Sequence, residues 1–279
     1  DNTRSRGLGD VYKRQMAPSV SYWDCGEFIA VSYTLGVPHP PGSPLFLLLG
    51  RIASMLPISE DIAFRVNLLS PLASAFSVLF LYFIIVQLVK HWRGKIETDT
   101  DALIAFGAGI VGSLTFAFTD SHWFNAVEAE VYAFSTFFTA IVVWLALLWS
   151  EKADEKGNER YILIIAYMIG LATGLHLLNL LTIPFVALLI YFKKYKFEWT
   201  SFSILVVVTG FVFFIIHNVI IKGMPKIADA IGVSATALLV ITIFAIMVWA
   251  IINHKQLLSI VSTSIVLVLI GYSTYAMIF

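Results

Sequence analysis

Long apolar runs separated by short polar segments dominate the chain from residue 64 onward. Runs of about 15 to 26 residues suit α-helices that cross a bilayer, whereas barrel strands would read as roughly ten-residue alternations. The pattern therefore predicts an all-α integral membrane protein. Its eight expected spans are Phe64–Val89, Ala102–Phe118, Val131–Trp149, Tyr161–Leu175, Leu178–Phe192, Trp199–Ile221, Ala230–Ile252 and Leu257–Phe279.

Two local signals refine these spans. The fourth and fifth could be read as one helix, but that helix would be about 48 Å long, too long for a ~30 Å hydrocarbon core. A hairpin at His176-Leu177 is therefore predicted between two short helices. Thr98 and Asp101 have the spacing of a helix-capping pair just before the second span.

The residues before the spans fall into two parts. Residues 1–15 are polar, lack apolar periodicity and resemble a translated linker, so we expect a foreign or unstructured tag on an N-terminally damaged fragment. Residues 16–279 are expected to form a single membrane-embedded domain, in which residues 16–63 are an outer loop and residues 64–279 hold the spans.

Short apolar segments inside the outer loop predict interfacial helices. Between Glu27 and Leu35, one apolar face is expected from Phe28, Ile29, Val31 and Leu35. The segment Leu45–Leu56 is apolar but too short to span a bilayer, and prolines bound it on both sides.

Composition agrees with a membrane protein and excludes several classes. The chain is 59% hydrophobic and 13% charged, about half the charged fraction of a soluble domain. Its net charge is zero, so it lacks the excess of basic residues that is typical of nucleic-acid-binding proteins. Cys25 is the single cysteine, which excludes an internal disulfide and a cysteine-rich metal site.

Lysine and arginine positions predict the orientation, because cytoplasmic loops carry an excess of both. The segments after the first, third, fifth and seventh spans hold ten: Lys90, Arg93, Lys95, Lys152, Lys156, Arg160, Lys193, Lys194, Lys196 and Lys255. The opposite side, from residue 16 on, holds four: Arg51, Arg65, Lys222 and Lys226. We therefore expect the first side to be cytoplasmic and the polar candidate residues to face outward.

The densest polar stretch is Ser21–Pro44, which contains Asp24, Glu27 and a His39-Pro-Pro-Gly turn. A three-residue spacing puts both carboxylates on one face of a helix, where they could act as a general base or bind a metal. A solvated loop with a capping acid would give the same spacing. The turn could have a purely structural role and direct the chain back into the membrane. Alternatively, His39 could donate a hydrogen bond to a phosphate or to an acceptor.

Further candidates lie on the same predicted side. Glu128 and Glu130 cannot share a helix face, so at most one is expected to point into a central cavity. Arg65 could pair with a lipid phosphate or reach lipid headgroups only, while His176 and Asn179 lie at the predicted hairpin. One outward-facing pocket is expected to be lined by Asp24, Glu27, Arg65, His176 and one of Glu128 and Glu130.

Several motifs resemble one known family. They are W-D-C-G-E-F-I (Trp23–Ile29), Y-T-L-G-V-P-H-P-P-G (Tyr33–Gly42), R-V-N-L-L-S (Arg65–Ser70), W-F-N-A-V-E-A-E-V-Y (Trp123–Tyr132), G-L-H-L-L-N-L-L-T-I-P (Gly174–Pro184) and G-Y-S-T-Y (Gly271–Tyr275). In this order they resemble the domain-of-unknown-function 2723 proteins, grouped as family-117 glycosyltransferases, whose animal relative is a protein O-mannosyltransferase. The chain departs from that family where residues 1–15 replace its first membrane helix and where it stops soon after Gly271.

The resemblance implies a GT-C-like multi-span helical bundle whose first outer loop is functional. It implies transfer of a sugar such as mannose from a polyprenyl-phosphate donor to Ser or Thr of exported proteins, at the periplasmic face of a bacterial inner membrane. An acidic residue of the first outer loop serves the acceptor, which maps onto Asp24 or Glu27; we expect Asp24 as base and Glu27 as its partner. His39, Arg65, Glu128, Glu130, His176 and Asn179 are expected to bind substrate.

No metal ligand set and no cofactor besides the lipid donor are assigned. The expected partners are membrane lipid, lipid-linked sugar and an exported protein acceptor. A transporter or lipid flippase, or a non-catalytic membrane scaffold, would explain the same polar groups. A transporter should also carry ionisable groups near mid-membrane.

Overall fold

A computed structural model describes residues 16–21, 24–40 and 42–275, and the predicted tag at residues 1–15 lies outside this part. The elements are helical: α2 (Cys25–Thr34), α3 (Pro44–Met55), α4 (Ile62–Asn67), α5 (Leu69–Arg93), α6 (Asp99–Ala117), α7 (Asp120–Ala126), α8 (Val131–Glu151), α9 (Glu159–Thr173), η1 (Leu177–Leu181), α10 (Thr182–Lys194), α11 (Trp199–Phe214), η2 (Ile215–Ile221), α12 (Gly223–Ile231), α13 (Val233–Ile252) and α14 (Gln256–Tyr272). The all-α prediction is confirmed.

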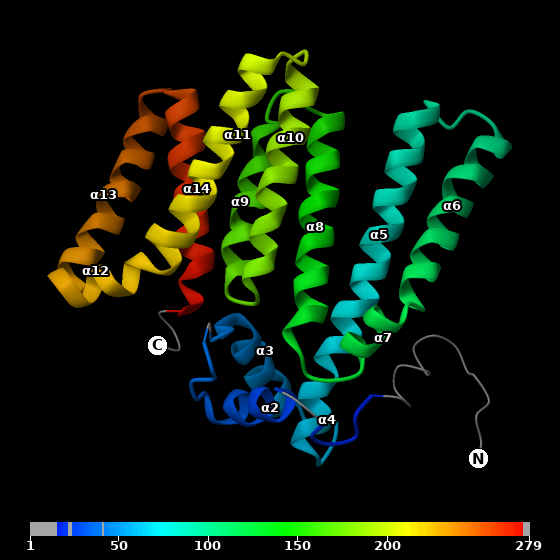
Figure 1. The fold of residues 1–279 in the computed structure, drawn as a ribbon, viewed down its shortest axis with the longest axis vertical. Coiled ribbons are helices and arrows are strands. Elements are labelled where there is room, and N and C mark those ends of the chain that lie inside the picture. The colour runs from blue at the N-terminus through cyan, green and yellow to red at the C-terminus, as the bar shows by residue number, and fades with distance from the viewer. Residues whose placement is uncertain (1–15, 22–23, 41, 276–279) are drawn as a thin grey trace. The chain divides into compact units, whose positions relative to one another are not determined.

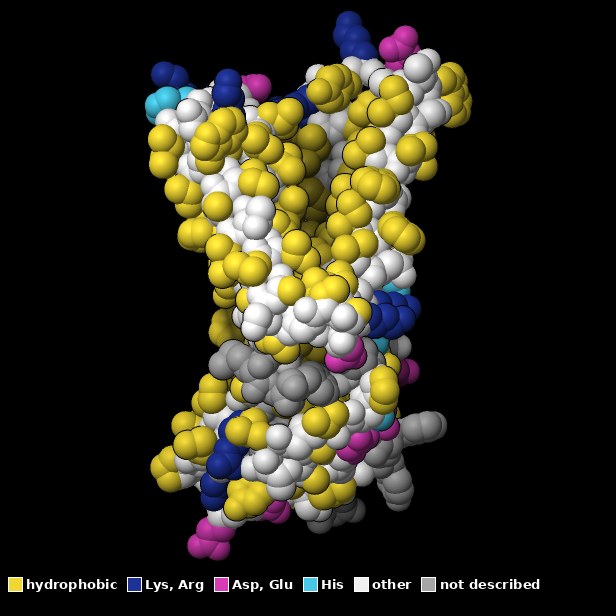
Figure 2. All heavy atoms as spheres, turned by 90° about the vertical axis from the view of Figure 1, so that its left-hand side faces the viewer, with side chains coloured by type: hydrophobic (Ala, Val, Ile, Leu, Met, Phe, Trp, Pro, Cys, Tyr) yellow, Lys and Arg dark blue, Asp and Glu magenta, His cyan; other side chains and the backbone are white. Residues whose placement is uncertain are grey.

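Six helical stretches of the described residues are long and apolar enough to cross a membrane, so the chain is a multi-pass membrane protein. They are Ile62–Arg93, Asp99–Ala117, Val131–Glu151, Leu177–Lys194, Trp199–Ile221 and Val233–Ile252. The other two predicted spans correspond to the shorter helices α9 and α14, of 15 and 17 residues. In Figure 2, hydrophobic side chains cover much of the visible helical surface.

The described residues divide into two compact units. The first comprises residues up to Trp144 together with Gly174–His176, and the second comprises Leu145–Thr173 and the residues from Leu177 on. Within the first unit, α5 and α6 form a hairpin (Figure 1), and α7 packs near the end of α5 that lies away from Gly94. Within the second, α9, α13 and α14 pack together.

Helix boundaries follow local chemistry. The predicted cap of α6 is confirmed, because Thr98 accepts from the Asp101 backbone N–H and Asp101 accepts from the Thr98 backbone N–H. Asp61 caps α4 by accepting from Ala63 and Phe64. The first predicted span therefore begins as a short helix and continues as α5 after a break at Leu68.

Both predicted short helices of the outer loop are present as α2 and α3. The predicted apolar face of α2 is partly wrong, because its buried residues are Cys25, Phe28, Ile29 and Ser32, while Leu35 is 46% exposed. The burial follows the i, i+3, i+4, i+7 spacing of a helix face. This spacing leaves the Glu27 side of α2 free of the core.

The predicted break between the fourth and fifth spans is present near His176, with the addition of a short 3₁₀ helix. α9 ends at Thr173, and the short 3₁₀ helix η1 precedes α10. The sequence did not predict the π-helical end of α11 over Ile215–Ile221, a form that is rare and usually short.

Candidate functional site

The two predicted carboxylates lie at the start of α2. Asp24 is the N-cap residue and Glu27 lies in the first turn, so both are close to the positive end of the helix dipole. Their side chains are 52% and 37% exposed. As predicted from the spacing, the helix presents both acids on one side, away from the residues it buries.

The turn after α2 brings His39 back to both acids. The backbone N–H of His39 donates to Glu27 Oε1 at 2.7 Å, and its ring Nδ1 lies 2.7 Å from Glu27 Oε2. Its Nε2 lies 3.8 Å from Asp24 Oδ2. Gly42 has a φ of +98°, a conformation that glycine adopts readily, and its N–H closes the turn on His39 O at 3.0 Å.

The proton equilibria of Glu27 and His39 are coupled. The hydrogen bond from the His39 side chain lowers the pKa of Glu27, and the same bond raises the pKa of His39, with smaller contributions from the charges of Glu27 and Asp24. The pair therefore favours an imidazolium held against a carboxylate. Because Asp24 lies on the far side of this imidazolium, the three groups form one charged cluster.

Asn67 joins the segments that carry the acids. Its Nδ2 donates to the carbonyls of Ala17 and Ser19 at 2.7 and 3.0 Å, and its Oδ1 accepts from the N–H of Ala129 at 3.0 Å. Cys25 Sγ lies 3.6 Å from the same oxygen. Asn67 is fully buried, so these contacts satisfy an amide that would otherwise be costly to bury.

The two acids of the acid loop, defined here as residues 127–130, have different partners. Glu128 accepts a hydrogen bond from Ser21 Oγ, whereas Glu130 accepts one from the N–H of Val131 at 3.2 Å. They are only 6% and 7% exposed. Burial raises the pKa of Glu130 to about 7, and the charges of Asp24 and Glu128 add to the shift.

His176 belongs to the first unit as well. The Ser43 hydroxyl donates to Leu175 O at 2.9 Å and the Leu45 N–H donates to Gly174 O at 2.8 Å, so the start of α3 fixes this short segment. The His176 ring lies 5.1 Å from the ring of Tyr132. Burial lowers the pKa of His176, which favours its neutral form.

Arg65 and Asn179 are held by backbone contacts. The Arg65 guanidinium donates to the carbonyls of Ser54, Ser59 and Glu60 and so braces the chain between α3 and α4. Asn179 belongs to the second unit, where its Nδ2 donates to Ala172 O at 3.4 Å. The substrate-binding roles predicted for both stay predictions.

The structure thus brings Asp24, Glu27 and His39 together. Glu130 lies close enough for the charges of Asp24 and His39 to affect its pKa. Sequence reasoning missed the structural role of Asn67. The motif R-V-N-L-L-S holds it between apolar residues, and an amide within an apolar stretch is the signal that could have found it.

The Asp24–Glu27–His39 cluster also has the spacing of a cation site, since one ligand atom from each lies within 4.8 Å of the others. Histidine and carboxylates would suit a zinc-like ion. In the structure, His39 Nδ1 lies against Glu27 and His39 Nε2 faces Asp24.

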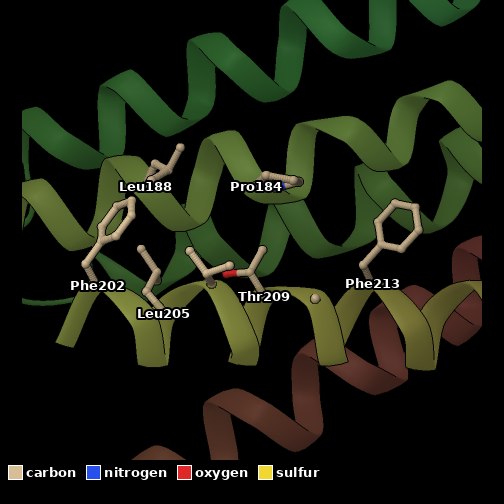
Figure 3. Close-up of a pocket in the computed structure, with 8 residues that line it drawn as sticks. Pro184, Leu188, Phe202, Leu205, Thr209 and Phe213 are labelled. Carbon is tan, nitrogen blue, oxygen red and sulfur yellow. The ribbon is translucent and has the colours of Figure 1, made fainter. Parts of the chain in front are cut away.

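A separate apolar cavity lies between α10 and α11 in the second unit (Figure 3). Its volume is about 330 Å³, and Pro184 and Leu188 of α10 face Phe202, Leu205, Thr209 and Phe213 of α11. The lining holds no acid or base, so this cavity can take an apolar chain but cannot perform proton transfer.

The helices and the charged cluster define a multi-pass membrane protein with an acid–imidazole site outside its spans. Residues 24–199 match the family model described as the protein O-mannosyl-transferase TMEM260 N-terminal domain. The chain belongs to this family.

Two relatives agree with the family match. The chain is 30% identical over 190 residues to protein O-mannosyl-transferase tmem260 of Dictyostelium discoideum, covering 63% of this chain and 21% of the relative. It is 28% identical over 162 residues to the TMEM260 protein of Mus musculus, covering 58% and 21%. The chain thus spans about a fifth of the length of these relatives. No solved structure matches it.

Proposed function

We propose that the chain is part of a membrane glycosyltransferase of GT-C type that transfers mannose from a polyprenyl-phosphate donor to Ser or Thr hydroxyls of exported proteins. The matching relatives are named protein O-mannosyl-transferases, which supports this reaction class. The observation that carries the proposal is the cluster of Asp24, Glu27 and His39 at the start of α2.

In this reaction Asp24 takes the proton of the acceptor hydroxyl. The hydroxyl oxygen forms a bond to the sugar anomeric carbon while the bond from that carbon to the phosphate oxygen breaks, and the lipid phosphate leaves with the bonding electrons. Asp24 suits the role because its carboxylate is half exposed and can meet a protein substrate. Glu27 is occupied by two hydrogen bonds from His39 and acts as a positioning residue.

The cluster would face the side of the membrane on which exported proteins fold. The ten-to-four distribution of Lys and Arg supports this orientation, because the segments that carry α2, α4 and α7 belong to the side that holds four of these residues. The periplasmic face of a bacterial inner membrane fits both the donor and the acceptor.

The decisive experiment replaces Asp24 by Asn in the full-length protein. A general base contributes about 10²–10⁴-fold in rate, so transfer of mannose from the purified lipid donor to an acceptor domain should fall by about that factor. The thermal midpoint in detergent should change little, because Asp24 makes no side-chain cap bond in α2 and its ion pair with His39 is half exposed.

The matched control is Glu60→Gln, which neutralises an exposed acid whose side chain lies outside the cluster. It should leave the transfer rate unchanged. Wild-type rates in the Asp24→Asn variant would refute the base assignment, and absence of transfer by the wild-type protein with any polyprenyl-phosphate sugar would refute the reaction class.

A further inference from the structure

The apolar cavity between α10 and α11 is a groove with an open side. Two of its lining residues, Leu188 and Val206, are 37% and 55% exposed. Within the described part of the chain, α11 has no buried residue along its length. Both helices belong to stretches that are long and apolar enough to cross a membrane. The groove is therefore accessible to the hydrocarbon chains of a surrounding bilayer.

The length of the groove matches the depth of one bilayer leaflet. Along α11 its lining runs from Phe202 to Phe213 (Figure 3), which is about 16 Å of helix. Half of a ~30 Å hydrocarbon core is about 15 Å. Gly210 leaves part of the wall without a side chain, and nothing lies within 4 Å of the position that its Cβ would take. The groove thus has the length and the open space to hold one hydrocarbon chain.

Aromatic side chains gather at the Phe202 end of the groove. The ring of Phe202 lies 5.9 Å from that of Tyr191 and 5.4 Å from that of Phe197. The ring of Trp199 lies 5.1 Å from that of Phe197, and Trp199 is exposed. Tyrosine and tryptophan are enriched where a membrane meets water. This end of the groove therefore lies next to the headgroup region.

Three lysines follow directly at the same end. Lys193 and Lys194 occupy the last turn of α10, and Lys196 lies in the link to α11. The Tyr191 hydroxyl folds this link back, because it accepts a hydrogen bond from the backbone N–H of Glu198 at 3.1 Å. Residues 193–198 therefore place three cations and one acid beside the entrance of the groove.

These lysines have weak protein partners. Lys193 Nζ lies 4.0 Å from a carboxylate oxygen of Asp154, whose side chain is almost fully exposed. Lys194 Nζ lies 5.5 Å from the centre of the Trp149 ring. Lys196 is exposed and has no salt bridge to any residue that the structure describes. An anionic headgroup can therefore bind all three without displacing a strong ion pair.

We propose that the groove between α10 and α11 binds an anionic phospholipid. One acyl chain lies between the helices, and the phosphate accepts hydrogen bonds from Lys193, Lys194 and Lys196. Clusters of lysine directly beside a membrane-spanning helix attract anionic lipids. The site goes beyond the proposed function and does not depend on it.

The predicted topology argues against the lipid-linked sugar as the occupant. The Lys and Arg distribution assigns residues 193–198 to the cytoplasmic side and Asp24 to the opposite side. A donor with its phosphate at these lysines would hold its sugar on the wrong side of the membrane for Asp24. A phospholipid of the cytoplasmic leaflet, which is rich in anionic lipids, fits both the charge and the depth of the groove.

The test measures lipid binding to the full-length protein after it has been purified in detergent and stripped of lipid. Native mass spectrometry follows titration with dioleoylphosphatidylglycerol and, separately, with dioleoylphosphatidylcholine, which has the same chains and no net charge. The first bound phosphatidylglycerol should bind about tenfold more tightly than phosphatidylcholine. The triple variant Lys193→Gln, Lys194→Gln and Lys196→Gln should lose this preference.

The matched control for charge removes three cations from the α8–α9 connection on the same predicted side: Lys152→Gln, Lys156→Gln and Arg160→Gln. This control should bind phosphatidylglycerol as the wild type does. An equal loss in both triple variants would show that the overall charge of this side, and not the groove, attracts the lipid.

Gly210→Leu tests the chain part of the site, because its side chain enters the groove without meeting protein atoms at Cβ. It should weaken binding of phosphatidylglycerol about tenfold. Lipid should raise the thermal midpoint of the wild type and raise that of this variant less, while the lipid-free midpoints stay similar. Gly107→Leu in α6 is the control, since nothing lies within 4 Å of its Cβ position either, and it should bind lipid normally.

Three outcomes would overturn the proposal. Equal affinities for the two phospholipids would remove the role of the lysines. An unchanged affinity in Gly210→Leu would show that the groove holds no lipid chain, as expected if another segment of the full-length protein covers it. Displacement of phosphatidylglycerol by a lower concentration of polyprenyl phosphate would assign the groove to the sugar donor instead.

Discussion

At the scale of single residues, hydrogen bonds distinguish the two candidate acids Asp24 and Glu27. Glu27 is hydrogen-bonded to both the backbone N–H and the ring of His39, and Asp24 remains half exposed beside the same ring. The sequence spacing gave no reason to prefer one acid over the other as the reactive group, whereas their hydrogen-bond partners in the structure differ. Under the proposed function, this difference favours Asp24 as the base and Glu27 as the positioning residue.

The first prediction at this scale concerns the His39 imidazole. Its pKa should lie above the ordinary value because of the Glu27 hydrogen bond, and Glu27→Gln should move it back toward that value. Asp24→Asn should have a smaller effect, because the Asp24 charge is a lesser cause. Histidine ring resonances in an NMR pH titration measure this directly, and an unchanged His39 pKa in Glu27→Gln would contradict the pairing.

The same pair sets a pH window for the turn. The raised pKa of His39 means that its stabilising contribution is present below the ordinary histidine value and is lost as pH rises through the raised one. The lowered pKa of Glu27 means that its contribution is present above the ordinary glutamate value and is lost as pH falls through the lowered one. The Glu27–His39 interaction should therefore stabilise the turn after α2 most strongly at mildly acidic to neutral pH.

A second residue-scale prediction concerns Asn67. Replacing it by Ala leaves the Ala129 N–H and the carbonyls of Ala17 and Ser19 without their buried partner, at a cost of about 1–3 kcal/mol for each group that water cannot reach. We expect a lower thermal midpoint and a reduced transfer rate.

The control for Asn67 is Asn125→Ala, which removes one exposed hydrogen bond to Ser121 O. It should change the midpoint little. Equal midpoints for the two variants would show that Asn67 does not hold the segments together.

At the scale of elements, close packing of α2 on α3 positions the acids. A Cβ placed on Gly50 of α3 would contact the Ser32 hydroxyl and lie 2.7 Å from Ser32 Cβ. Ser32 is fully buried and lies on the buried face of α2, which does not include the acids. The glycine therefore allows α2 and α3 to pack closely at Ser32.

Gly50→Ala should destabilise the protein by about 1–3 kcal/mol, the usual cost of overpacking. Ser32→Gly removes the atoms that the new methyl group meets, so the double variant should recover part of the loss. Gly107→Ala in α6 is the control, because nothing lies within 4 Å of its added Cβ. Thermal midpoints in one detergent compare the variants, and equal losses for Gly50→Ala and Gly107→Ala would contradict close packing.

At the scale of the whole molecule, the number of membrane crossings and their direction determine where the cluster faces. The loop with Lys152, Lys156 and Arg160 follows α8, and α7 precedes that helix at its other end. Since α8 is long enough to span, the two loops should lie on opposite sides of the membrane.

Cysteine labelling tests this topology. In intact cells, a membrane-impermeant thiol reagent should label Ser121→Cys and should not label Lys156→Cys until the cells are opened. The background is Cys25→Ser, which removes a buried thiol while its hydroxyl can still donate to Asn67. The opposite labelling pattern would place the cluster on the cytoplasmic side and refute the proposed acceptor.

The sequence alone determined the helical membrane class, because long apolar runs leave few other structures able to satisfy the backbone in lipid. It also determined the cap at Thr98 and Asp101, the two short helices of the outer loop and the shared face of Asp24 and Glu27. These features depend on residues within one or two helical turns of each other, and hydrophobic periodicity and capping chemistry describe such ranges well.

Only the tertiary structure decided which face of α2 is buried, because that depends on Gly50 of α3 accepting Ser32 rather than on α2 itself. It also decided that Glu27 binds His39 and that Arg65 binds backbone carbonyls, since several partners were chemically equivalent in sequence. Asn67 shows the reason most clearly. Its amide contacts residues 42 or more positions away in the sequence, and no periodic pattern encodes which distant groups will share one buried side chain.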